Sequence, residues 1–124
     1  MNGPASTAGI VVVAVLFLGM GVYALIAPTH LAAPFHQVAT PEGRSEVRAV
    51  YGGFGIAVAA MLGVATVDPG DIRRGVVVTV AAALAGMALG RIVSRAVGDR
   101  TRFYPVWFYG CIEAVGAAVL AASQ

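Results

Sequence analysis

Four long apolar stretches occupy most of this chain and limit what it can fold into. They cover residues 8–27, 46–67, 72–97 and 103–122, and most of their positions are Ala, Val, Leu, Ile, Gly or Met. A helix needs about 20 apolar residues to cross the hydrocarbon core of a bilayer. The stretches therefore predict an all-α integral membrane protein, an up-down four-helix transmembrane bundle that forms a single membrane domain over residues 1–124.

The composition supports a membrane protein and excludes other classes. Of the residues, 59% are hydrophobic and 11% are charged, whereas soluble domains average about 25% charged residues. The net charge of +2 is spread over the loops, so a nucleic-acid-binding role has no support. The single cysteine, Cys111, excludes an internal disulfide, and its apolar surroundings in the sequence predict a small buried hydrophobe.

Turn and capping residues place the helix ends. Pro28 ends the first stretch, and the second helix is expected to start with Thr40 as its N-cap and Pro41 as its first residue. Residues 68–71, with the sequence Asp-Pro-Gly-Asp, predict a tight turn in which Asp71 caps the third helix. The long helices are thus joined by three loops.

Three ionisable residues lie inside the apolar stretches, where a charge costs at least a few kcal/mol. Arg48 follows Pro41 by seven residues, Arg91 precedes Gly98 by seven, and Glu113 lies in the last stretch. With a rise of 1.5 Å per residue, we expect all three at one depth, roughly 10–12 Å from the same membrane face. The predicted ligand-binding residues are those of this layer and its helical neighbours: Arg48, Arg91, Glu113, Glu46, Tyr51, Tyr23, Tyr109 and Ser94.

The excess of arginine in this layer favours ligand binding. One carboxylate, Glu113, cannot neutralise both Arg48 and Arg91, so the layer suits a small anionic, quinone-like or lipid ligand that is bound or translocated. Alternatively, an interhelical ion pair only fixes the helix register of a structural or accessory subunit. Acid–base catalysis by Glu113 is a third hypothesis.

Motifs of catalysis and of metal binding are missing from the sequence. His30 and His36 have no third ligand at metal spacing, and there is no phosphate-binding glycine loop, nucleophile elbow or paired-cysteine motif. The sequence therefore favours a role other than catalysis, with no cofactor and no catalytic or metal-binding residue.

Charges and glycines bear on orientation and assembly. Loops 1 and 3 share one membrane face and carry more arginine than loop 2, so the positive-inside rule places them in the cytoplasm, in a bacterial inner membrane. The small-xxx-small pattern of Gly86 and Gly90 allows close helix contact. We expect this contact within the bundle, with a homo-oligomer interface as the alternative.

The segment Glu46-x-Arg48-Ala-x-Tyr51-Gly52-Gly53 resembles a bacterial family of small four-span membrane proteins, domain of unknown function 4345. Gly90-Arg91-Ile-Val-Ser, the lone Glu113 and Pro28 extend the resemblance over essentially the whole chain. It marks Glu46, Arg48, Tyr51, Gly52, Gly53, Arg91 and Glu113 as family-pattern positions and implies no activity. A looser similarity to DoxX-like proteins suggests redox or lipid-associated accessory roles. Small multidrug transporters differ, because their essential carboxylate lies in the first helix, which has no acid in this chain.

Overall fold

The computed structural model describes residues 4–36, 40–68 and 70–123, and every regular element within them is helical. Four helices are long and apolar enough to cross a membrane: Pro4–Ile26, Pro41–Val67, Asp71–Ala96 and Phe103–Ala121. The predicted all-α four-helix architecture is therefore confirmed. In chain order the elements are α1 Pro4–Ile26, α2 Pro28–Ala32, η1 Ala33–Phe35, α3 Pro41–Val47, η2 Arg48–Gly53, α4 Phe54–Val67, α5 Asp71–Ala96, η3 Phe103–Trp107 and α6 Phe108–Ala121.

The helix ends follow the local chemistry of the sequence in most cases. At the start of α3, the Thr40 hydroxyl accepts a hydrogen bond from the backbone N–H of Gly43 at 3.0 Å, as expected of an N-cap. Asp71 differs from its prediction, because it is the first residue of α5 and Gly70 occupies the capping position. Instead, Asp68 accepts a hydrogen bond from the Gly70 N–H at 2.7 Å. Pro69, in the middle of this predicted turn, lies outside the described residues.

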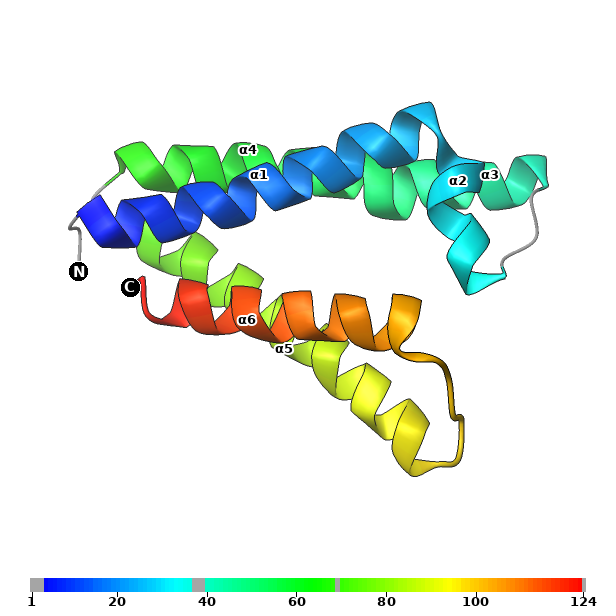
Figure 1. The fold of residues 1–124 in the computed structure, drawn as a ribbon. Helices are drawn as coiled ribbons and strands as arrows, with labels where there is room; N and C mark the ends of the chain where they lie inside the picture. The colour runs from blue at the N-terminus through cyan, green and yellow to red at the C-terminus, as the bar shows by residue number, and fades with distance from the viewer. Residues whose placement is uncertain (1–3, 37–39, 69, 124) are drawn as a thin grey trace.

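The long helices associate as two pairs, α1 with α4 and α5 with α6 (Figure 1). The pairs pack against each other at the end that holds both termini and loop 2, residues 68–70, and α5 diverges from α1 and α4 toward its C-terminus. The shared hydrophobic core lies at the end where the two helix pairs pack against each other. It consists of Ile10, Val13, Leu62, Val77, Val80, Leu84 and Leu120. At the other end, α1, α2 and α3 form a second small core of Ala24, Ala32 and Val47.

Glycines allow the backbones of α1 and α4 to approach closely. A Cβ atom on Gly21 would lie 2.8 Å from the Gly52 carbonyl oxygen, and one on Gly55 would lie 3.0 Å from the Phe17 carbonyl oxygen. By contrast, Gly86 and Gly90 are exposed, and a Cβ on either would have no neighbour within 4 Å among the described residues. The predicted role of this glycine pair within the bundle is wrong, because the face of α5 that carries it is turned outward.

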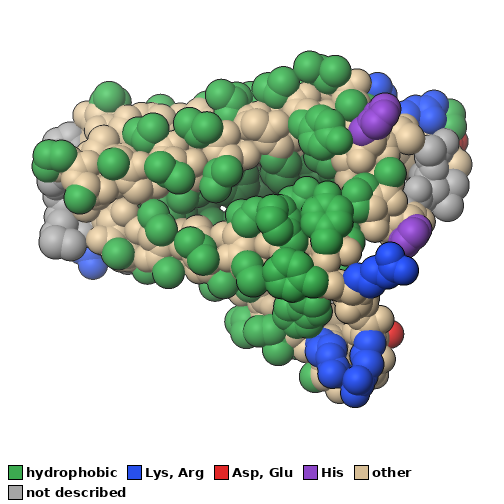
Figure 2. All heavy atoms as spheres, viewed as in Figure 1, with side chains coloured by type: hydrophobic (Ala, Val, Ile, Leu, Met, Phe, Trp, Pro, Cys, Tyr) green, Lys and Arg blue, Asp and Glu red, His purple; other side chains and the backbone are tan. Residues whose placement is uncertain are grey.

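The surface is largely apolar along the helices and basic at one end (Figure 2). Most arginine side chains seen in this view gather at the end formed by loop 1, residues 27–40, and loop 3, residues 97–102. Between the two helix pairs the surface is hollowed, with hydrophobic side chains at its edge. Cys111 is exposed on α6, so the prediction of a buried thiol is wrong. The apolar sequence around Cys111 could not show which face of the helix it occupies.

Candidate functional site

The best-defined polar contact inside the bundle is an ion pair between α5 and α6. Arg91 donates from Nε to Glu113 Oε1 at 2.8 Å and from Nη2 to Oε2 at 2.9 Å, the two-pronged geometry that makes such pairs strong. The Glu113 side chain is 7% exposed and that of Arg91 is 22% exposed. Gly110 makes room for the arginine, because a Cβ there would lie 3.2 Å from Arg91 Cδ.

Two of the four tyrosines of the chain lie near this ion pair, and the other two lie near Tyr109. Tyr51 and Tyr109 interact electrostatically with Arg91. Tyr109 in turn interacts with Tyr104 and Tyr23. Tyr23 comes from the first long helix, Tyr51 from the second, Arg91 from the third and Tyr104 and Tyr109 from the fourth. We call Tyr23, Tyr51, Tyr104 and Tyr109, together with Arg91 and Glu113, the tyrosine–arginine site.

Two π-helical segments carry tyrosines of this site. Tyr51 lies in η2, where the helix between α3 and α4 widens, and Tyr104 lies in η3 with an extended backbone at φ −93° and ψ 132°. Such segments change the direction in which side chains leave a helix and are frequent at functional sites. Aromatic rings pack around them, with Phe35 of η1 5.7 Å from Tyr109 and Phe108 5.3 Å from Tyr109 between ring centroids.

The structure gives Arg48 a partner other than Glu113. Its Nε donates to the Leu25 carbonyl oxygen at 3.1 Å, and its side chain is exposed. Leu25 lies in the last turn of α1, which ends at Ile26. The carbonyl end of a helix carries a partial negative charge that attracts a cation. Arg48, the arginine that Glu113 could not neutralise in the predicted layer, therefore lies at a helix end.

Arg73 donates in the same way to the carbonyl end of α4, and this role was not predicted from the sequence. Its side chain is buried, with the residue 5% exposed, and Nη1 donates to the Ala65 carbonyl oxygen at 3.3 Å, two residues before the end of α4. Nη2 donates to the Thr7 hydroxyl of α1, also at 3.3 Å, while Nε has no acceptor among the described residues. The short turn between α4 and α5 was the available signal in the sequence. Such a turn places the first residues of α5, and so Arg73, beside the carbonyl end of α4.

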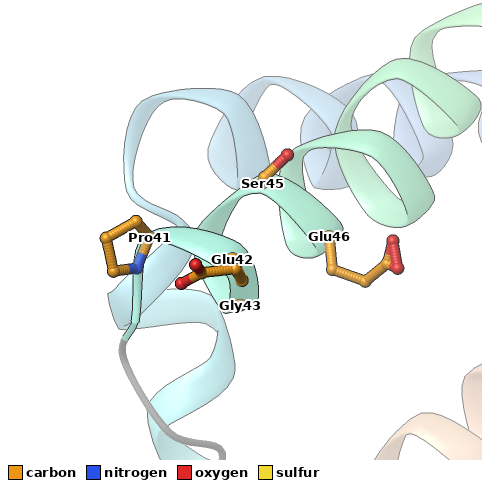
Figure 3. Close-up of a pocket in the computed structure, with 5 residues that line it drawn as sticks. All are labelled: Pro41, Glu42, Gly43, Ser45 and Glu46. Carbon is orange, nitrogen blue, oxygen red and sulfur yellow. The ribbon is translucent and has the colours of Figure 1, made fainter.

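The structure places Glu46 and Ser94 outside the tyrosine–arginine site. Glu46 is exposed and lines a shallow surface hollow on α3, with its carboxylate directed away from Glu42 (Figure 3). Ser94 donates to Asp99 Oδ2 at 3.3 Å and so belongs to the end of α5. Of the eight predicted ligand-binding residues, the structure gathers Arg91, Glu113, Tyr51, Tyr23 and Tyr109.

The chemistry of the site is donor-rich and electrically balanced. Arg91 and Glu113 neutralise each other, and both carboxylate oxygens of Glu113 already accept a hydrogen bond. The third guanidinium nitrogen, Nη1 of Arg91, has no acceptor among the described residues. No group of three potential metal ligands occurs in residues 4–36, 40–68 and 70–123. The arrangement can therefore offer hydrogen bonds to an acceptor without adding charge.

Comparison with known proteins identifies one family. The family described as Domain of unknown function (DUF4345) matches residues 5–124, almost the whole chain. No curated protein and no solved structure matches the sequence.

Proposed function

The chain belongs to the Domain of unknown function (DUF4345) family, and we propose that it is a multi-pass membrane protein that binds a small amphipathic molecule at the tyrosine–arginine site. Insertion in a bilayer is supported by the four long apolar helices and by the apolar side chains that cover their outer faces. We place the chain in a bacterial inner membrane, and the excess of arginine in loops 1 and 3 favours an orientation with these loops in the cytoplasm.

The observation that carries this proposal is the position of Tyr51 and Tyr109 beside the Arg91–Glu113 ion pair, with Tyr23 and Tyr104 beside Tyr109. Ionisable groups in transmembrane helices are costly and mark functional positions by default. A purely structural pair needs only its two partners, yet here Tyr51 of the second long helix and Tyr109 of the fourth each bring a hydroxyl near Arg91. Tyr23 of the first long helix lies near Tyr109. Nη1 of Arg91 remains open to a guest. The polar part of the ligand accepts hydrogen bonds from these groups, and its apolar part lies in the hollow between the helix pairs.

Native mass spectrometry of the purified protein tests this proposal. We expect the wild type to retain a small molecule, and Tyr51→Phe and Arg91→Gln to lose most of it. Arg95→Gln is the matched control, because Arg95 lies one turn farther along α5 and is exposed. If no molecule is retained, or if all variants retain it equally, the proposal is wrong.

A structural role is the second candidate, favoured by the closed two-pronged geometry of the ion pair. In that case Arg91 and Glu113 only fix the register of α5 against α6. The exchanged variant, Arg91→Glu with Glu113→Arg, should then restore the thermal stability that either single change removes. Loss of ligand without loss of stability in Tyr51→Phe would decide against this candidate.

A further inference from the structure

The charge balance of the tyrosine–arginine site bears on the chemical class of its ligand. Building on the proposed function, we infer that the ligand is an uncharged lipid whose head is a flat ring with carbonyl oxygens, a quinone-type molecule. Three observations support this class: the neutrality of the ion pair, the excess of hydrogen-bond donors and the aromatic rings beside them.

Neutrality disfavours an anionic ligand. Arg91 is matched by Glu113, while Arg48 and Arg73 donate to the carbonyl ends of α1 and α4. Within the tyrosine–arginine site, which includes neither Arg48 nor Arg73, the formal charges of Arg91 and Glu113 therefore cancel. An anion bound at Nη1 of Arg91 would lie close to the Glu113 carboxylate, and repulsion between like charges is strong where water is excluded. An uncharged head avoids this cost.

The free hydrogen-bonding groups call for an acceptor. The guanidinium of Arg91 can only donate, and Nη1 is the nitrogen without a partner among the described residues. The hydroxyl of Tyr51, which lies near Arg91, can donate as well, whereas the hydroxyl of Tyr109 interacts with that of Tyr104. The acceptor oxygens of Glu113 are both occupied. Carbonyl oxygens accept such hydrogen bonds and carry no net charge.

The aromatic rings favour a flat head with an apolar tail. Ring centroids lie 5.6 Å apart for Tyr104 and Phe108 and 6.2 Å apart for Tyr104 and Tyr109, so the rings form one cluster with Phe35. Aromatic rings prefer offset or edge-to-face neighbours at such distances, so a flat ring is a head that this cluster can pack against. The hollow between the helix pairs, with hydrophobic side chains at its edge, leaves room for the tail (Figure 2).

Fluorescence of the single tryptophan tests the inference. Trp107 lies in η3, between Tyr104 and Tyr109, and a quinone quenches tryptophan on contact. The full-length protein in phosphatidylcholine nanodiscs is titrated with a benzoquinone that carries a decyl tail. We expect saturable quenching and a Kd roughly 5-fold or more weaker in Tyr51→Phe, because one hydrogen bond is lost. Ser94→Ala, which removes a hydroxyl that is bonded to Asp99 instead, should leave the Kd unchanged.

A competition experiment with an anion distinguishes a failure of this inference from a failure of the proposed function. Decanoate, which has a tail of similar length and a carboxylate head, should not reverse the quenching. If decanoate competes, or if quenching never saturates and does not change in Tyr51→Phe, the quinone-type assignment is wrong. Retention of another molecule in the mass-spectrometric experiment would still support the proposed function. If neither probe binds and no molecule is retained, both are wrong.

Discussion

Three of the arginines have partners of two kinds, and the kind of partner determines what each side chain contributes. Arg91 is paired with a carboxylate, Arg48 donates to the last turn of α1 and Arg73 donates to the last turn of α4. Helix carbonyl ends attract cations without cancelling a full charge. Arg48 and Arg73 therefore keep a positive charge, but they hold it at helix ends and not at the Arg91–Glu113 ion pair.

Removal of the Glu113 charge should destabilise the protein, because it leaves Arg91 unpaired. We expect Glu113→Gln to lower the free energy of unfolding by about 3 kcal/mol, the lower end of the range for breaking a buried ion pair. Denaturant unfolding in detergent, followed by circular dichroism, measures this loss. The double variant Arg91→Gln with Glu113→Gln should lose less than the two single changes added together. Strict additivity would show that the pair is not coupled.

Adjacent arginines in the first turn of α5 should behave differently. Arg73 is buried and bonded to Ala65 and Thr7, whereas Arg74 is exposed. We expect Arg73→Met to cost about 1–3 kcal/mol, because buried hydrogen-bonding groups lose their partner. Arg74→Met should change stability by less than about 0.5 kcal/mol. Equal effects in the same unfolding measurement would contradict the assignment of Arg73 to the end of α4.

At the scale of elements, the two helix pairs are held by different means. α1 and α4 meet through glycines at backbone contact distance, which favours dispersion contacts where lipid offers no hydrophobic driving force. α5 and α6 are joined by the ion pair and by side-chain packing over Gly110 and Gly116, where a Cβ would lie 3.2 Å from Arg91 Cδ and from Leu84 Cδ1 respectively. The α1–α4 contact should therefore tolerate side-chain growth least.

A pair of alanine substitutions tests this difference. Gly21→Ala places a Cβ 2.8 Å from the Gly52 carbonyl oxygen, and we expect a loss of about 1–3 kcal/mol from overpacking. Gly86→Ala, with no neighbour within 4 Å among the described residues, should be neutral or stabilising because alanine favours the helix. Thermal unfolding in detergent compares the two. A destabilising Gly86→Ala would instead indicate that this face of α5 is covered, for example by a second copy of the chain.

At the scale of the whole molecule, charge is distributed unequally between the two ends. The end formed by loops 1 and 3 carries five arginines and three carboxylates besides the ion pair, and the opposite end carries two of each. The first group consists of Arg44, Arg48, Arg95, Arg100 and Arg102 with Glu42, Glu46 and Asp99, and the second of Arg73 and Arg74 with Asp68 and Asp71. The net positive charge therefore lies entirely at the end toward which the helix pairs diverge.

Cysteine labelling tests the sidedness that this distribution predicts. In a Cys111→Ser background, Gly70→Cys in loop 2 should react with a membrane-impermeant maleimide in intact cells, and Thr101→Cys in loop 3 should react only after the membrane is opened. Both positions are exposed in the structure. The reverse pattern would place loops 1 and 3 outside the cytoplasm and contradict the positive-inside assignment.

The sequence by itself determined the helices, most of their ends and the shared level of Arg91 and Glu113 along the bundle. Apolar length, Pro28, Thr40 and Pro41 act locally, and a constant rise per residue turns sequence distance into depth, so Arg91 and Glu113 could be placed at one level. Only the tertiary structure decided which side chains of each helix face the neighbouring helices, because this depends on which helices pair and how closely. That pairing turned Cys111 and Gly86 outward. It also placed Arg48 and Arg73 at helix ends and brought Tyr51 and Tyr109 to the ion pair between Arg91 and Glu113.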